Sequence, residues 1–379
     1  MKKILSLVTL LLFAFVLVGC GEETTAATTA GTTAATTAAP TTAAALTYEI
    51  ALVTDVGNID DKSFNEGAWN GVVEYATANG ITYTYYRPTE DSDAARVESI
   101  DAAIAAGAKI VVCPGFLFET AIYEVQGDNP TVAFLLLDGE PHTADYATYE
   151  TLANTHNVLY QEEQAGFLAG YAAVMDGYRD LGFMGGMAVP AVVRYGYGFV
   201  QGAEYAAVQE SLTDVTIKYG YADAFWASPE LETQMDLWYA GGAEVVFACG
   251  GGLYLSVVAA AENTTAGKVI GVDVDQVAES TRIITSAMKG LTLSVADALA
   301  AFYDNSMAWP TALAGVTSTL GATTDGIGLP TATASWGFDT FTVTQYDAIF
   351  ALLVAGTVVV SPAIDVEPTV TVVTVDYVE

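Results

Sequence analysis

Short apolar runs alternate with stretches of helical spacing along the chain from residue 48 onward. The runs have the length and composition of buried strands and lie at residues 49–54, 82–86, 109–113, 132–137, 181–184, 215–221, 244–248 and 268–271. Apolar residues recur at helical spacing between them, at Phe64, Ala68 and Val72 and then within residues 95–105, 161–175, 194–209 and 253–261. Strands that alternate with helices predict βαβ units, in which helices cover both faces of a parallel sheet. The predicted fold class is therefore α/β.

The length and charge of the chain limit its function. With 379 residues, of which 52% are hydrophobic, it is long enough for roughly two domains with cores. Its 45 acidic residues against 12 basic ones give a formal net charge of −33. A phosphate backbone or an anionic membrane surface needs a basic footprint, so we expect neither nucleic acid nor a polybasic membrane contact.

The amino terminus has the pattern of an export signal. Lys2 and Lys3 precede an apolar run, residues 4–18, that is too short to span a bilayer comfortably, which predicts a signal peptide over residues 1–19. The run ends in LVGC, residues 17–20, which resembles the bacterial lipobox and implies lipidation of Cys20. The alternative is an ordinary buried cysteine. Residues 20–46 are mostly Thr and Ala and predict a tether, so the lipid would anchor a folded body at residues 47–379 to the membrane.

Residues with catalytic chemistry form no recognisable pattern. Cys113 and Cys249 lie in apolar runs and are predicted to be buried thiols. His142 and His156 adjoin no nucleophile motif, and the sequence has neither Gly-x-Ser-x-Gly nor a metal-ligand cluster. Glycines at 196, 198 and 202 lie off the dinucleotide-binding spacing. We therefore expect no enzyme, no cofactor and no metal.

Polar and aromatic residues follow the predicted strands. In open α/β sheets, ligands bind beyond the carboxyl ends of the strands. Here those ends contain Asp55, Gly115, Phe116, Asp138, Gly185, Gly186, Asp223, Phe225, Trp226, Gly250, Gly251, Gly252 and Asp273, with no basic residue among them. Asp and Gly are also common turn residues, so any one of these positions has an ordinary explanation. As a set they predict a cleft for a neutral ligand with hydroxyls and a flat ring.

Four segments closely resemble motifs of one family. They are residues 51–65 (ALVTDVGNIDDKSFN), residues 182–194 (GFMGGMAVPAVVR), residues 271–276 (GVDVDQ) and residues 285–289 (TSAMK). They resemble the basic membrane protein family of PnrA-like purine-nucleoside-binding lipoproteins, and the similarity runs from about residue 50 to residue 291.

This resemblance implies a fold and a role. The fold would be periplasmic-binding-protein-like of type I, with the ligand between two lobes. The first lobe would comprise about residues 47–155 and a later return segment, and the second about residues 156–280 and part of the C-terminal region. The protein would bind purine nucleosides on the extracytoplasmic face of the cell membrane and deliver them to the permease and ATPase subunits of an ABC importer.

The resemblance also implies site residues. Asp55 would contact the base or ribose, Asp138 would be a second binding carboxylate, and Asp273 with Lys289 would hold the ribose hydroxyls. Phe64 would form one face of an aromatic sandwich. Trp226, counted back from Pro229, would form the other, with Ser228 in place of the family's acid and Phe225 as a core neighbour. Three further residues are expected from their positions alone: Asn65 could reach the ligand from the start of its helix, and Gly250 and Gly251 could allow the backbone to approach the ligand or form a tight turn.

Other interpretations remain open. Phe64 also lies on the apolar stripe of its helix, Asp275 could cap the segment that follows it, and Asp61 and Lys62 could pair or cap a helix. The Trp226 and Ser228 departures allow a different flat or polyhydroxylated ligand, such as a sugar or a vitamin. A surface adhesin is the alternative from another functional class.

Overall fold

A computed structural model describes residues 47–378, which belong to one compact unit. The predicted signal peptide, Cys20 and the tether lie outside the described residues. Within residues 47–378, no helix is both long enough and apolar enough to cross a membrane.

The first sheet has the strand order β11-β5-β4-β3-β1-β2, and all its neighbours pair in parallel. Its register aligns Leu52 with Tyr85 on one side and with Val112 on the other. The central strands are completely buried because helices cover both faces. The strands are β1 (Ile50–Val53), β2 (Tyr83–Tyr86), β3 (Ile110–Pro114), β4 (Ala133–Leu137), β5 (Thr155–Tyr160) and β11 (Thr317–Leu320).

The second sheet has the order β12-β10-β9-β8-β6-β7-β13 and is parallel except for β12, which pairs antiparallel with β10. Its strands are β6 (Asp180–Gly185), β7 (Thr216–Tyr221), β8 (Val245–Cys249), β9 (Lys268–Asp273), β10 (Ile283–Lys289), β12 (Ile327–Gly328) and β13 (Thr374–Tyr377). Two lobes, each built on a sheet flanked by helices, confirm the predicted α/β class.

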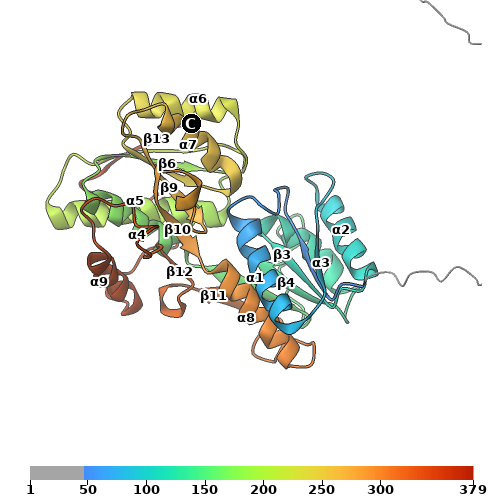
Figure 1. Ribbon diagram of the computed structural model, residues 1–379. Helices are drawn as coiled ribbons and strands as arrows, with labels where there is room; N and C mark the ends of the chain where they lie inside the picture. Colours follow the sequence, from blue (N-terminus) through green and yellow to red (C-terminus); the bar gives the residue numbers. More distant parts are fainter. Residues whose placement is uncertain (1–46, 379) are drawn as a thin grey trace, which may run out of the picture. The chain divides into compact units, whose positions relative to one another are not determined.

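Helices cover the sheets in both lobes (Figure 1). Helix α8 lies beside α1, where Thr292 Oγ1 donates to the carbonyl of Gly67 at 3.0 Å. The helices are α1 (Phe64–Asn79), α2 (Asp93–Ala105), α3 (Glu119–Gln126), α4 (Glu162–Asp176), α5 (Pro190–Glu210), α6 (Pro229–Ala240), α7 (Tyr254–Glu262), α8 (Leu291–Asp304) and α9 (Val343–Val354).

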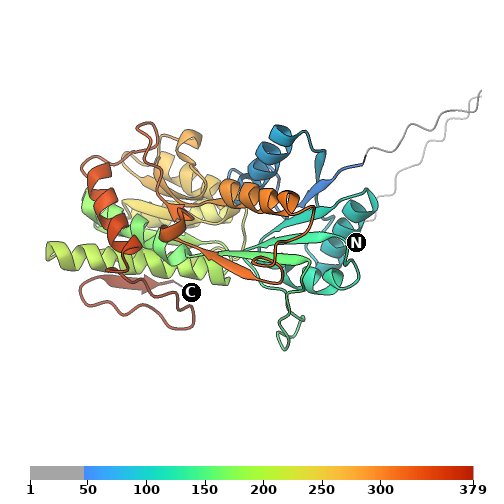
Figure 2. The same ribbon diagram turned by 90° about the horizontal axis from the view of Figure 1, so that it is seen from below.

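Glycines bring α4 and α5 into backbone contact. A Cβ atom on Gly166 or Gly170 of α4 would collide with the backbone of α5, and one on Gly198 or Gly202 of α5 would collide with the backbone of α4. The glycine spacing in residues 196–202 therefore serves helix packing. In Figure 2 the long α5 runs along the second lobe, with the C-terminal segment beside it. The Glu204 carboxylate on α5 accepts hydrogen bonds from the amides of residues 371–373.

The chain passes between the two sheets at three places. It leaves the first sheet after β5, returns after β10 and leaves again after β11. Strand β5 thus lies in the first sheet although the second lobe was expected from about residue 156, and β10 extends the second lobe to Lys289. Within residues 47–378, the first two connections touch where the Tyr160 hydroxyl lies 2.5 Å from Ser294 Oγ.

Strands β5 and β10 are absent from the sequence prediction because they contain buried polar residues. Asn157 in β5 donates to Thr151 Oγ1 at 2.9 Å and to Thr317 Oγ1 at 3.1 Å. Ser286 in β10 accepts from the Gln276 amide at 3.0 Å. These hydrogen bonds allow Asn157 and Ser286 to be buried, and the polar residues interrupt the sequence of each strand, so neither strand forms a continuous apolar run.

Candidate functional site

A cavity of about 400 Å³ opens at the carboxyl ends of strands from both sheets. All nine expected ligand residues line it: Asp55, Phe64, Asn65, Asp138, Trp226, Gly250, Gly251, Asp273 and Lys289. Asp223, which follows β7, is exposed and does not line the cavity, so the strand-end rule placed one carboxylate wrongly. The strand ends were expected to contain no basic residue, but two basic residues line the cavity there: Arg87 directly after β2, and Lys289, which only the family resemblance indicated, at the end of β10.

The start of α1 is organised by an aspartate. The Asp61 carboxylate accepts from the amides of Ser63, Asn65 and Glu66, which caps the helix. Lys62 pairs with Glu66 at 3.0 Å instead of with Asp61. The Ser63 hydroxyl is consequently free of capping and donates to Asp273 Oδ2 at 2.6 Å, which joins the first lobe to the second.

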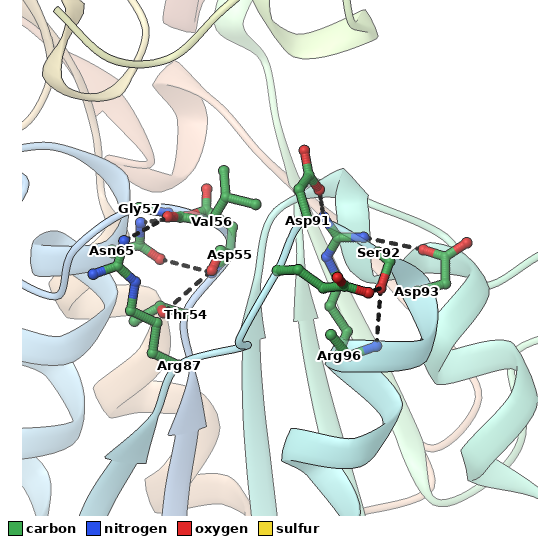
Figure 3. A network of polar contacts seen from close by, with 12 residues as sticks. Thr54, Asp55, Val56, Gly57, Asn65, Arg87, Asp91, Ser92, Asp93 and Arg96 are labelled. Carbon is green, nitrogen blue, oxygen red and sulfur yellow. Dashed lines mark hydrogen bonds and ion pairs between the residues drawn. The ribbon is translucent and has the colours of Figure 1, made fainter. Parts of the chain in front are cut away.

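Asp55 is held by the loop that follows it (Figure 3). Its Oδ1 accepts from the Gly57 amide at 2.6 Å and from Asn65 Nδ2 at 2.8 Å. Asn65 also donates to Asp61 Oδ2 at 3.0 Å and accepts from the Asp55 amide at 3.3 Å, so both of its amide hydrogens are engaged within the protein. Asn65 therefore acts on the cavity mainly by orienting Asp55.

Two arginines support this loop and its neighbour (Figure 3). Arg87 donates to Asn58 Oδ1 at 2.6 Å and to the Val56 carbonyl at 3.1 Å, which fixes the loop along one side of the cavity. Arg96 is buried and pairs with Asp91 and with Asp93, the latter at 3.1 Å. The guanidinium of Arg87 therefore holds this loop in place at the exposed edge of the cavity.

Lys289 is the centre of a buried ion cluster. Its Nζ pairs with Asp138, lies 3.3 Å from Glu162 Oε1 and lies 3.9 Å from Asp273 Oδ1. Arg194 Nε contacts the other oxygen of Glu162 at 2.5 Å. The ammonium also lies 4.8 Å from the centre of the Phe64 ring, with Tyr195 and Tyr160 rings at 5.3 and 5.5 Å.

The cluster shifts the pKa values of its members. Burial raises the pKa of Asp138 to about 7, although Lys289 pulls it in the opposite direction. Burial alone would raise the pKa of Glu162, but Lys289 and Arg194 together hold it below its ordinary value. Burial would lower the pKa of Lys289, but the three carboxylates outweigh it and raise that pKa. When all members are ionised, three carboxylates face two cations, so the cluster has a net negative charge.

The raised carboxyl pKa values predict a protein that mild acid stabilises. Burial raises the pKa of both Asp138 and Glu163 to about 7, so the folded chain binds more protons than the unfolded chain between that pH and the ordinary carboxyl range. Each of the two groups should raise the free energy of unfolding by about 2 kcal/mol as the pH falls from 8 to 5.5, so we expect a rise of about 4 kcal/mol in all. Urea unfolding midpoints at the two pH values measure the effect. Asp138→Asn should remove part of the difference, and a midpoint that is lower at pH 5.5 would contradict the assignment.

Two aromatic side chains of the second lobe, Phe225 and Trp226, also line the cavity. Phe225 and Trp226 precede α6, and the Trp226 side chain is 56% exposed. Phe225 was expected to be a core neighbour, but it both packs against the core and lines the cavity. A Cβ atom on Gly250 would lie 2.8 Å from the Phe225 ring, and one on Gly251 would lie 2.6 Å from the Phe225 carbonyl oxygen. These two glycines therefore make room for Phe225.

Ser228 has a local role at the start of α6. Its hydroxyl accepts from the Leu231 amide at 3.1 Å and caps the helix, and its backbone pairs with Ser256 Oγ on both sides. Ser228 does not line the cavity. The Ser228 side chain therefore serves the start of α6 and not the cavity.

Several residues that shape the site were not predicted. Glu162 has the pattern of an ordinary acid at a helix start, and Tyr195 that of a core aromatic. Arg194 and Ser63 lie inside the recognised motifs, which was the signal available for them. The buried thiols of Cys113 and Cys249 are confirmed. Asp275 accepts from the amide of Val277 at 3.1 Å, which fits its expected capping role.

The sequence and the structure match known proteins. Residues 49–345 match the Bmp family, described as ABC transporter substrate-binding protein PnrA-like, so the similarity continues past the expected limit at residue 291. The ABC transporter nucleoside-binding protein BmpA of Lactococcus lactis subsp. cremoris is 28% identical over 238 residues, which cover 60% of this chain and 64% of that protein. Basic membrane protein A1 of Borrelia garinii subsp. bavariensis is 27% identical over 253 residues, covering 65% and 70%. The chain thus spans slightly less than two thirds of the Lactococcus relative.

Solved structures share the architecture. An ABC transporter system solute-binding protein from Aeropyrum pernix K1 superposes with a TM-score of 0.65 at 23% identity, covering 82% of this chain and 80% of that one. AraP, an arabinose-binding protein from Geobacillus stearothermophilus, gives a TM-score of 0.56 at 14% identity, covering 77% and 99%. The fold is that of a type I periplasmic binding protein. With the family match extending over the cavity and every strand of both sheets except β13, the chain belongs to the Bmp family of PnrA-like ABC transporter substrate-binding proteins, a family of binders and not of enzymes.

Proposed function

We propose that the cavity binds purine nucleosides and that the protein delivers them to an ABC importer. The observation that carries the proposal is the pairing, in one cavity, of aromatic rings with a lysine held between carboxylates from both lobes. A relative described as a nucleoside-binding protein of an ABC transporter supports it.

The aromatic side chains suit a planar base. Phe64 starts α1 in the first lobe, whereas Phe225 and Trp226 come from the second, so a base can be enclosed by rings from both. Stacking of a base on an aromatic side chain contributes about 1–3 kcal/mol and tolerates different bases. Asp55 has one carboxylate oxygen engaged by Gly57 and Asn65, so its other oxygen can accept from the edge of the base.

The ion cluster suits ribose hydroxyls. Asp138 and Asp273 can accept from neighbouring hydroxyls, while Lys289 can donate to a hydroxyl oxygen. Asp138 Oδ1 is buried and has no hydrogen-bond partner within residues 47–378, which leaves it for a ligand. The negative charge of the cluster opposes a phosphate, so we expect nucleosides to bind and nucleotides to bind weakly.

Transport and anchoring follow from the same assignment. Closing of the two lobes around a nucleoside would present a surface to the permease and ATPase subunits. Lipidation of Cys20 would hold the protein at the extracytoplasmic face of the membrane, with residues 20–46 as the tether.

A pair of neighbouring aspartates tests the assignment. Asp273→Asn should weaken inosine binding at least about tenfold, because a charged acceptor is lost from the cavity. Asparagine tolerates the left-handed backbone at this position, where φ is +66°, so the loop should be preserved. Asp275→Asn is the control, since Asp275 caps the next turn and does not line the cavity. Calorimetric titration measures both, and wild-type affinity in Asp273→Asn would refute the proposed role of this carboxylate.

A further inference from the structure

The Lys289 ammonium has three carboxylate partners, but only two of them line the cavity. Asp138 follows β4 of the first lobe and Asp273 ends β9 of the second, and both line it. Glu162 is completely buried outside the lining, 3.3 Å from the ammonium. Glu162 is therefore a partner of the lysine that a ligand in the cavity does not touch.

Arg194 holds Glu162 from the other side. Its Nε lies 2.5 Å from Glu162 Oε2, and its side chain is 17% exposed. Arg194 is also absent from the cavity lining. A chain of contacts thus runs from Arg194 on α5 through Glu162 on α4 to Lys289 on β10, and from there to Asp138 and Asp273.

The position of Glu162 in the chain gives this contact its importance. Glu162 opens α4 immediately after β5, and Lys289 ends β10 immediately before α8. These are two of the places where the chain passes between the sheets. The ion pair between Glu162 and Lys289 consequently joins two of the connections about which the lobes would move.

We propose that Glu162 and Arg194 are positioning residues of the ligand site, which fix the Lys289 ammonium between one carboxylate of each lobe. The inference rests on the proposed nucleoside function only for the identity of the ligand. With the ammonium fixed, Asp138 gives its Oδ2 to Lys289 and keeps Oδ1 buried and unpartnered, facing a ligand hydroxyl. Without Glu162, the ammonium has two carboxylate partners in place of three, and it can shift toward Asp138 or Asp273 alone.

The charge of Glu162 also affects the protonation of Asp138. Burial is the main cause that raises the pKa of Asp138 and Glu162 raises it further, whereas Lys289 and Arg194 lower it. A ligand hydroxyl that donates to Asp138 favours the ionised carboxyl, so affinity should be full at high pH and fall as the pH drops through about 7. Replacing Glu162 with glutamine removes a negative charge and should move this fall to lower pH. The charged or titratable groups around Asp138 are Lys289, Glu162, Arg194, Asp273, Tyr160, Tyr195 and Cys249.

Neighbouring glutamates provide a matched test. Glu162→Gln and Glu163→Gln change adjacent buried residues at the start of α4 in the same way, but Glu163 has no ion pair with Lys289 within residues 47–378. We expect Glu162→Gln to weaken inosine binding about tenfold at pH 8 and to lower the pH midpoint of the affinity. Glu163→Gln should leave the inosine affinity within about twofold of the wild type and the pH midpoint within a few tenths of a pH unit. Arg194→Met should weaken binding and Arg194→Lys should restore part of it.

Three outcomes separate the possibilities. A lower melting temperature of Glu162→Gln with unchanged affinity and pH midpoint would reduce Glu162 to a structural residue and overturn the inference. If the wild type binds no nucleoside, the proposed function fails, and carboxyl carbon NMR titration then decides the inference without a ligand. In that titration Glu162→Gln should lower the pKa of Asp138 while Glu163→Gln leaves it in place, with Asp138→Asn identifying the signal. An unchanged pKa of Asp138 in Glu162→Gln would contradict the inference.

Discussion

Replacement of Lys289 with methionine is expected to lower the free energy of unfolding by about 3–5 kcal/mol, because it leaves three buried carboxylates without their shared cation. Methionine keeps much of the length of the side chain, so packing changes little. The carboxyl groups relieve part of their repulsion by binding protons, which makes the loss larger at pH 8 than at pH 6. Urea unfolding at the two pH values measures the loss, and calorimetry should show inosine affinity reduced about 10- to 100-fold.

Lys62→Met is the control for this variant. Lys62 forms one ion pair with Glu66 at 3.0 Å, and its side chain is 42% exposed. Water and salt screen an exposed pair of this kind, so Lys62→Met should unfold close to the wild type. If Lys289→Met were as stable as Lys62→Met, the cluster would not hold the two lobes as described.

Gly202→Ala is expected to destabilise the fold by about 3 kcal/mol. The new Cβ atom would lie 2.7 Å from the carbonyl carbon of Phe167 and 2.8 Å from its Cα, and these backbone atoms of α4 cannot yield as a side chain can. The helices would have to separate along their contact, which also displaces Glu162 on α4 and Arg194 on α5. Denaturant unfolding should show the loss of stability, together with weaker ligand binding.

Gly127→Ala provides the matched control. Gly127 follows α3 with φ of −72° and ψ of −36°, which alanine adopts without strain, and its Cβ would meet only Leu152 Cδ1 at 3.7 Å. The same substitution there should change stability by no more than about 0.5 kcal/mol. An unfolding midpoint of Gly202→Ala equal to that of Gly127→Ala would contradict the close packing of α4 on α5.

The strands with apolar sequences were predictable because the period and length of an apolar run depend on local burial alone. Strands β5 and β10 were not, since the buried polar residues Asn157 and Ser286 interrupt the apolar run that marks the other strands. The glycines at 198 and 202 were noticed but gave no interpretation. Their spacing shows which face of α5 has small residues, and only the fold shows that Gly166 and Gly170 of α4 lie against that face.

The cavity residues were predictable to a similar degree. Asp55, Asp138 and Asp273 follow strands, so the topology of a parallel sheet brings them to one edge. Lys289 came only from the family resemblance, because its strand was not recognised. Glu162 could not be found from the sequence, since its contact with Lys289 depends on two chain connections that are far apart along the chain.

Titration of the folded body, residues 47–379, with a panel of ligands tests the central claim most directly. The panel comprises inosine, guanosine, adenosine, cytidine, ribose and AMP, and calorimetry at pH 8 measures the binding of each. The account predicts micromolar or tighter binding of the purine nucleosides, and binding of AMP at least about 100-fold weaker than that of adenosine, because the ion cluster already has excess negative charge. Equal affinity for AMP and adenosine, or no heat from any purine nucleoside with a folded protein, would contradict it.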